Sequence, residues 1–192
     1  IFVFMELNEF LNNFNLSDEE IEMVQALTHK AHLHTGEEFG HPDKKSDTVY
    51  FIVKGMVRIY RIIDGEDFTY YFCPSGELCA DYQSIIMKTP GKQYFQATTP
   101  TDLIAISYSK IEALFEAHPR IERIARKLSE TAYIRLAERV KEFQSDSLEQ
   151  RYLNLIEHHE ELFQTASLQH IASYLGVKPQ SLSRIRAKIL KK

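Results

Sequence analysis

The 192-residue sequence predicts an α+β protein in which a β-rich part, a long helix and a small helical part follow one another. Three observations predict this order. Residues 28–108 carry many short strand-like runs separated by Gly-containing turns. Residues 120–143 have the apolar spacing of one long helix, and residues 168–187 have the pattern of two short helices joined by a tight turn.

The β-rich part is preceded by a helical segment at residues 5–27, in which Ser17 and Glu20 form a capping box. The strands themselves are predicted at 49–53, 57–62, 68–72, 94–98 and 103–107. Lys54-Gly55 is interpreted as a hairpin turn between the first two strands, and Asp64-Gly65 as the next turn. Many short strands joined by tight turns indicate a β-sandwich or β-roll.

Helices are predicted after the last strand. Ser109 is expected to cap a short helix that ends at Phe115. The apolar stripe of residues 120–143 is narrow and lies on a charged helix, which is typical of a helix that packs on another helix. Two arrangements stay open: pairing with the same helix of a second copy, or packing on its own β-domain. Ser145-Asp146-Ser147 is the expected hinge before a further helix at 148–159.

The pattern at residues 168–187 fits a helix-turn-helix. Ala172 is small enough for two helices to cross closely, and Gly176 lies where the turn needs a positive φ. Pro179 suits the first turn of the second helix, where its missing N–H is not needed. The apolar positions that hold the two helices together are Ile171, Leu175, Val177, Leu182 and Ile185. An ordinary helical hairpin is the alternative.

The second helix of this motif leaves polar and cationic side chains facing outward. They are Lys178, Gln180, Ser181, Ser183, Arg184 and Lys188. Such donors and cations read base edges and phosphates in a major groove. Residues 178–192 carry a net charge of +6 on a chain of −4, so residues 1–177 sum to −10. A basic tip on an acidic body predicts a local contact with double-stranded DNA, against the alternative of a solvated basic helix end.

Several other classes of protein are disfavoured by the composition. No stretch approaches the roughly 20 apolar residues of a membrane span, so no membrane partner is expected. Cys73 and Cys79 do not make a disulfide framework, which favours the cytoplasm. The sequence leaves open whether Met5 is the natural first residue, with residues 1–4 as an upstream remnant.

No catalytic or metal-binding pattern stands out. The sequence has no P-loop, paired carboxylates or Ser-His-Asp order, so we expect no catalytic residues and no enzyme. His32 and His34 would share a strand face, but no Cys or carboxylate joins them at a ligand spacing. We therefore expect no metal site, and we interpret Cys73 and Cys79 as buried apolar residues rather than a redox pair.

The chain resembles the CRP/FNR family of bacterial transcription regulators over nearly its full length. The resemblance is carried by residues 50–58, by the turn Pro74–Glu77, by Arg151-Tyr152, by Ile171-Ala172 with Leu175-Gly176, and by Ser181–Arg184. It implies a cyclic-nucleotide-binding-like β-roll (a double-stranded β-helix) with flanking helices, a long dimerisation helix and a C-terminal, winged-helix-like DNA-binding domain. The wing strands are not obvious, and residues 162–165 leave little room for them.

The resemblance also divides the chain and suggests a function. Residues 1–119 would form the effector domain, 120–144 the dimerisation helix and linker, and 145–192 the DNA-binding domain. The expected function is a homodimeric, sequence-specific transcription regulator, with RNA polymerase left open as a partner. The alternative is a ligand-binding regulatory module that acts on a protein partner; the basic segment after Lys178 argues against it.

The predicted effector pocket departs from the family pattern. Cyclic-AMP binders use a Gly-Glu pair for the ribose and a later Arg-Ser pair for the phosphate. Counted back from Gln96-Ala97, these pairs fall on Ala80-Asp81 and Gly91-Lys92, so the arginine is absent. The family's adenine-contacting Thr-Ser falls near the apolar Leu136-Ala137. We therefore expect no response to cyclic AMP and no cofactor. Two interpretations stay open: the pocket binds a small anionic effector, or Asp81 only caps a helix.

Overall fold

The computed structural model describes residues 7–189 and divides into two compact units. The first unit contains the chain up to residue 60 together with 72–128, and the second contains 61–71 together with 129 onward. No helix within the described part is long and apolar enough to cross a membrane. The α+β fold class predicted from the sequence is confirmed.

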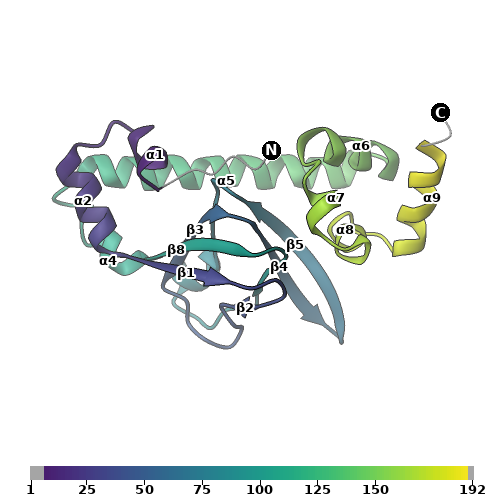
Figure 1. Cartoon of the computed structure of the whole chain (residues 1–192), viewed down its shortest axis with the longest axis horizontal. Coiled ribbons are helices and arrows are strands. Elements are labelled where there is room, and N and C mark those ends of the chain that lie inside the picture. The colour runs from purple at the N-terminus through teal and green to yellow at the C-terminus, as the bar shows by residue number, and fades with distance from the viewer. Residues whose placement is uncertain (1–6, 190–192) are drawn as a thin grey trace. The chain divides into compact units, whose positions relative to one another are not determined.

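Two four-stranded antiparallel sheets form a β-roll (Figure 1). One sheet has the order β1 (Thr28–Leu33), β8 (Thr101–Ser107), β3 (Thr48–Lys54) and β6 (Leu78–Ala80). The other has the order β2 (Glu38–Phe39), β7 (Tyr94–Ala97), β4 (Met56–Ile63) and β5 (Glu66–Pro74). Buried side chains from both sheets fill the space between them, among them Ile52, Val57 and Ile59.

The turn at Lys54-Gly55 is not the hairpin expected from the sequence. It connects β3 of one sheet to β4 of the other, so the flanking strands are not neighbours. Gly55 has a φ of 96°, and a Cβ there would lie 2.5 Å from Thr101 Oγ1 and 2.6 Å from the Pro100 carbonyl oxygen. Glycine is needed because the chain turns sharply against the β7–β8 loop. Asp64-Gly65 does form the expected hairpin turn between β4 and β5, with positive φ at both residues.

Two short helices lie in the segment predicted to be helical before the β-roll, of which residues 5 and 6 are outside the described residues. Helix α1 spans Leu7–Asn12, and α2 spans Asp18–Ala26 with the predicted capping box of Ser17 and Glu20. Their apolar faces cover the outer face of the sheet that contains β3 and β8, beside the start of α5 (Figure 1). The buried cluster consists of Leu7, Leu11, Ile21, Val24, Phe51, Ile104, Ile106 and Ile121.

The predicted cap at Ser109 is wrong. Helix α4 spans Tyr108–Glu112, and Ser107 is its N-cap residue. The Ser107 hydroxyl does not cap the helix; Asp47 accepts hydrogen bonds from Ser109 N at 2.9 Å and from both serine hydroxyls at 2.8 Å. Burial raises the pKa of Asp47, but these hydrogen bonds outweigh it and hold the pKa below its ordinary value of 3.8.

The long helix predicted at 120–143 is present as α5 (Pro119–Ser145). The second unit then continues with α6 (Leu148–His158), α7 (Leu162–Thr165), α8 (Leu168–Tyr174) and α9 (Pro179–Ile189). Ser147, in the expected hinge, forms a capping box with Gln150 at the start of α6. The stretch without obvious wing strands, residues 162–165, is helical. The predicted boundaries at residues 119 and 144 stay a prediction.

Candidate nucleic-acid interface and effector site

Helices α8 and α9 pack together through the apolar positions that the sequence indicated. Ile171, Leu175 and Leu182 are buried, and Ala172 is fully inaccessible at the crossing. Ser167 accepts a hydrogen bond from His170 N at 3.2 Å and so caps the start of α8. The close contact that the small Ala172 permits therefore holds α9 in one position on α8.

The turn between α8 and α9 takes the left-handed conformation at Gly176, whose φ is 70°. Gly176 N donates to the Ser173 carbonyl and Val177 N to the Ala172 carbonyl, each at 2.9 Å. These bonds satisfy carbonyls at the end of α8 that would otherwise lack a partner. The positive φ predicted from Gly176 is thus present.

The outward face of α9 presents most of the predicted DNA-contacting residues to solvent. Gln180 and Arg184 are exposed and lie about 40° apart around the helix axis. Ser181 is half-buried, and the exposed Ser183 donates its hydroxyl to the Pro179 carbonyl at 3.0 Å. Two of the cations form ion pairs within the unit: Lys178 with Glu66 and Lys188 with Glu149.

An aromatic ring anchors the turn to the last part of α5. Arginine guanidiniums lie over the Phe143 ring, with Arg139 at 4.9 Å and Arg151 at 4.5 Å from the ring centre. Arg139 also donates to the Tyr174 carbonyl at 2.7 Å and Arg151 to the Leu175 carbonyl at 3.0 Å. Two cations therefore meet the negative end of the α8 dipole and position the turn. The sequence analysis named Arg151 but not Arg139, which lies one turn before Phe143 in α5.

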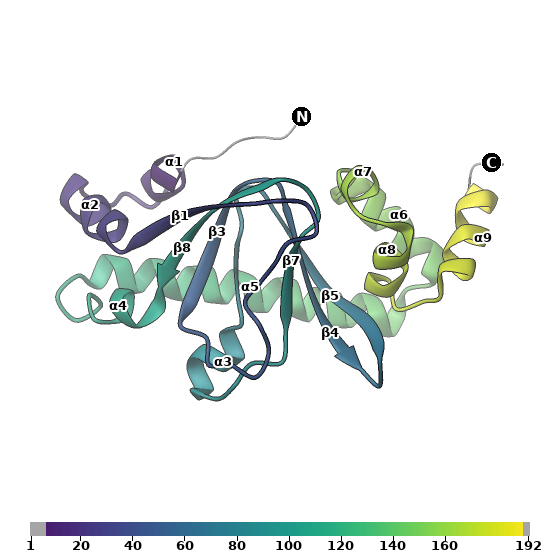
Figure 2. The ribbon, with the colours of Figure 1, turned by 60° about the horizontal axis from the view of Figure 1, so that its bottom comes forward.

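In the first unit, the predicted effector residues surround α3 (Tyr82–Met87), which lies at the ends of β3 and β7 (Figure 2). Asp81 is buried and caps α3 by accepting from Ser84 N at 3.1 Å. A Cβ added to Gly91 would lie 2.3 Å from Asp81 Oδ2, so these two predicted residues do meet. Ala80 is half-buried at the end of β6, and Lys92 is exposed.

Aromatic rings occupy the interior of the roll between its two sheets. Tyr50 of β3 lies 4.9 Å from Phe39 and 5.9 Å from Phe95, measured between ring centres. The two phenylalanines of the opposite sheet are 5.6 Å apart. Burial raises the pKa of the Tyr50 hydroxyl above its ordinary value of 10. This part of the interior is apolar and close-packed, which suits a stable roll better than a charged ligand.

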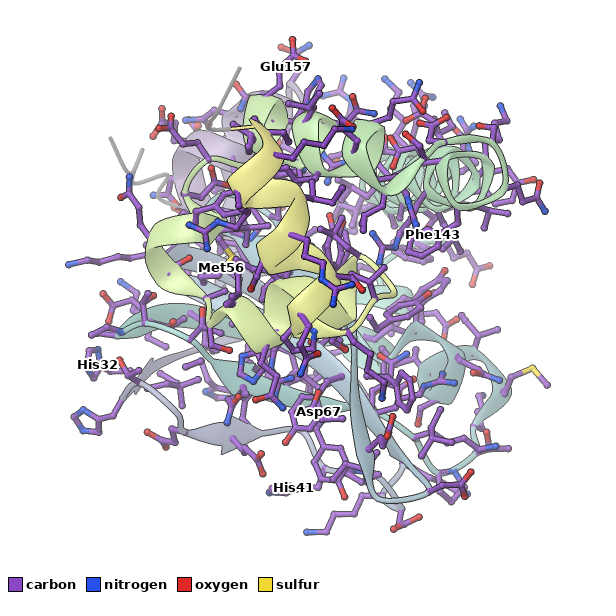
Figure 3. All side chains as sticks on the ribbon, turned by 90° about the vertical axis from the view of Figure 1, so that its right-hand side faces the viewer. His32, His41, Met56, Asp67, Phe143 and Glu157 are labelled. Atoms are coloured by element: carbon purple, nitrogen blue, oxygen red, sulfur yellow. The ribbon has the colours of Figure 1, made fainter. Side chains whose placement is uncertain are left out.

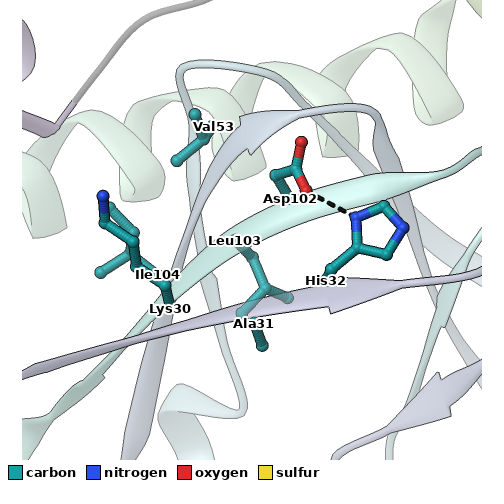
Figure 4. A pocket seen from close by; sticks show the side chains of 7 residues that line it. All are labelled: Lys30, Ala31, His32, Val53, Asp102, Leu103 and Ile104. Carbon is teal, nitrogen blue, oxygen red and sulfur yellow. Dashed lines mark hydrogen bonds and ion pairs between the residues drawn. The ribbon is translucent and has the colours of Figure 1, made fainter.

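A hollow of about 430 Å³ lies on the outer face of the β1–β8–β3 sheet (Figure 4). His32 Nδ1 pairs with Asp102 Oδ1 at 2.6 Å across neighbouring strands, and both side chains are about half exposed. The lining residues include no Ser, Thr or Cys that this pair could activate as a nucleophile. Among the described residues, no three His, Cys, Asp or Glu side chains group as metal ligands.

Comparison with known proteins gives a match to one domain family and to several solved structures. Residues 30–118 match the family model of the cyclic nucleotide-binding domain. Similar structures include the c-di-GMP-responsive regulator CLP of Xanthomonas campestris, at 19% identity and a TM-score of 0.71, covering 91% of this chain and 92% of that one. FixK2 of Bradyrhizobium japonicum has 19% identity and a TM-score of 0.69, with 85% of each chain covered.

A third similar structure is that of a protein from Eubacterium rectale described as a putative transcriptional regulator of the CRP/FNR family. It has 15% identity and a TM-score of 0.72, covering 95% of this chain and 87% of that one. A comparison with curated protein sequences gives no match. Residues 30–118 are therefore similar to a cyclic nucleotide-binding domain, and the chain shares the fold of these structures, as the sequence resemblance implied. The Xanthomonas campestris and Eubacterium rectale proteins are both described as regulators.

Proposed function

We propose that this protein is a homodimeric, sequence-specific DNA-binding transcription regulator of the cytoplasm, whose effector domain does not respond to cyclic AMP. The observation that carries the proposal is the outward face of α9. Gln180, Ser183 and Arg184 are exposed on a helix fixed by the buried Leu182. A helix with rigid support and exposed donors is suited to a major groove.

Base reading is assigned to Arg184, with Gln180 one turn earlier on the same face. An arginine fork can donate two hydrogen bonds to guanine, and a glutamine amide can pair with adenine. Lys178, Ser181, Ser183 and Lys188 are assigned to phosphates or neighbouring bases. The macrodipole of α9 adds positive potential at its start, where a phosphate is favourable.

Dimerisation is assigned to the apolar stripe of α5. Tyr133, Leu136 and Val140 are 71%, 45% and 48% exposed within one chain. Their spacings of three and four residues place them on one side of the helix. Exposed apolar side chains in a continuous stripe favour a second copy of the same helix as the occupant.

The proposal excludes cyclic AMP because the equivalent positions have other roles. The Asp81 carboxylate, at the position expected to hold the ribose, already caps α3. Residue 91 has no side chain, and even a Cβ there would collide with Asp81. Leu136 offers no hydroxyl to adenine. A small anion held by Lys92 is the remaining effector hypothesis.

The proposal is tested by the affinity of Arg184→Ala for an operator and for random DNA, measured by fluorescence anisotropy. Loss of a bidentate base contact should cost roughly 1–3 kcal/mol of discrimination, a drop of about 5- to 150-fold in the operator-to-random affinity ratio. Arg186→Ala is the matched control, because it removes the same charge from about 160° around the same helix.

The ratio should change little for Arg186→Ala. An unchanged ratio for Arg184→Ala would contradict the assignment of that residue. If the wild-type chain binds no DNA but does bind a small ligand, the alternative of a regulatory module for a protein partner is favoured instead.

A further inference from the structure

We propose that the tip of the β4–β5 hairpin, residues 61–71, is a built-in competitor of DNA, in which the Glu66 carboxylate occupies the position of a phosphate beside Lys178. The hairpin tip and the helix-turn-helix belong to the same compact unit. The inference rests on the proposed DNA-binding function, and it adds an affinity-setting residue that lies outside the helix-turn-helix.

The hairpin is attached to α8 by two hydrogen bonds that converge on one side chain. Thr69 N donates to Ser173 Oγ at 2.8 Å, and the Ser173 hydroxyl donates to the Asp67 carbonyl at 3.1 Å. Thr69 is 95% buried, so the backbone bond at this point is shielded from water. Figure 3 labels Asp67 on the hairpin. One serine therefore fixes where the hairpin tip lies on the motif.

This attachment brings Glu66 to the first turn of α9. Lys178 Nζ lies 3.2 Å from Glu66 Oε1 and 3.3 Å from Oε2, so the ammonium meets both oxygens. The Lys178 carbonyl accepts from Ser181 N at 3.0 Å, which puts Lys178 at the N-terminal end of the 11-residue helix α9. A carboxylate at this end is favoured by the helix macrodipole as well as by the lysine.

The same position suits a DNA phosphate for the same two reasons. A phosphate and the Glu66 carboxylate both offer anionic oxygens as hydrogen-bond acceptors. They compete for Lys178, because its one ammonium group carries a single positive charge. The tip also carries Asp64 and Asp67, whose charges oppose a polyanion. DNA binding therefore has to displace the Glu66–Lys178 pair, and the hairpin lowers DNA affinity without touching the base-reading residues.

The expected effect is modest because the pair is exposed, with 74% of the Lys178 side chain and 61% of the Glu66 side chain accessible. Glu66→Gln in the full chain should tighten binding to a fluorescent random-sequence duplex of about 30 base pairs by about two- to fivefold at low salt. A random sequence is sufficient because phosphate contacts are sequence-independent. Asp64→Asn removes the same charge from the same tip and is the matched control, with a smaller gain expected.

A double-mutant cycle separates competition for Lys178 from the general field of the tip. In a Lys178→Met background, the gain from Glu66→Gln should fall to the small gain of Asp64→Asn, because the contested cation is gone. Equal gains from Glu66→Gln and Asp64→Asn, or a gain from Glu66→Gln that is as large without Lys178 as with it, would overturn the inference. Binding of the duplex by wild type with no gain from Glu66→Gln overturns the inference alone; no binding by any variant overturns the proposed function with it.

Discussion

Gly176 is the position where one added methyl group should do the most damage to the helix-turn-helix. Its φ of 70° is a conformation in which an L-residue with a Cβ costs about 1–2 kcal/mol. The added Cβ would lie 2.8 Å from Cε1 of Phe143, closer than real contacts. Arg139 and Arg151 lie against the Phe143 ring, so a shift of the ring would disturb both contacts. Overpacking of this kind costs about 1–3 kcal/mol.

The two costs together predict that Gly176→Ala lowers the unfolding free energy of the second unit by about 2–5 kcal/mol. Urea denaturation followed by circular dichroism measures this. Gly65→Ala is the control, because Gly65 belongs to the same unit and has a φ of 79°, yet a Cβ there has no atom within 4 Å. Only the backbone cost of about 1–2 kcal/mol applies to it.

A double variant isolates the contact with Phe143. In a Phe143→Leu background the ring is absent, so Gly176→Ala should cost only about as much as Gly65→Ala. The reasoning is refuted if Gly176→Ala is no more destabilising than Gly65→Ala, or if its cost is the same with and without the Phe143 ring.

Three further predictions test the dimer, the α4 cap and the effector domain. Leu136→Asp should give a monomer when the molecular mass is measured by light scattering. Ile134→Asp is the control and should stay dimeric, because residue 134 lies about 160° away around α5. A wild-type protein that is monomeric at micromolar concentration would contradict the dimer. Asp47→Ala should lower the unfolding free energy by about 1 kcal/mol at neutral pH. Because the pKa of Asp47 is lowered in the folded state, this difference should shrink as the pH falls below 3.8, and a constant difference would refute the cap. Calorimetry should detect no micromolar binding of cyclic AMP. If cyclic AMP binds at micromolar concentration and also tightens operator binding, the family's ribose and phosphate pairs have been matched to the wrong positions within residues 76–97.

The parts of the fold that depend on local patterns could be predicted from the sequence. Gly176 required a positive φ, and the spacing from Ile171 to Leu182 required two packed helices, so the motif was defined by neighbours within a few turns. The capping box at Ser17 was equally local. These features follow from short-range geometry that holds whatever the rest of the chain does.

Features that depend on distant segments could not be predicted in the same way. Lys54-Gly55 has the composition of a hairpin turn, but the β7–β8 loop packed against Gly55 directs the next strand into the other sheet. The cap at Ser109 was misplaced because Asp47, from another loop, supplies the acceptor. A turn or cap signal in the sequence does not reveal which distant segment completes it.

The candidate site shows the same division. The exposed face of α9 was readable from helical spacing alone, and the absence of an arginine near Gly91 followed from the family resemblance. The contacts of Glu66 and Ser173 join residues more than 100 positions apart, and no local pattern signals them. The aromatic residue Phe143 at the end of the α5 stripe was visible in the sequence, but its role at the turn required the structure.

The most direct test of the account is a selection of sequences from random double-stranded DNA by the purified wild-type protein. The account predicts enrichment of a pseudo-palindrome whose half-sites lie about one helical turn, roughly 10 base pairs, apart, because two α9 helices of a symmetric dimer would enter successive major grooves. Enrichment of no motif, or of a single half-site without symmetry, would contradict the claim that this chain is a dimeric, sequence-specific DNA-binding regulator.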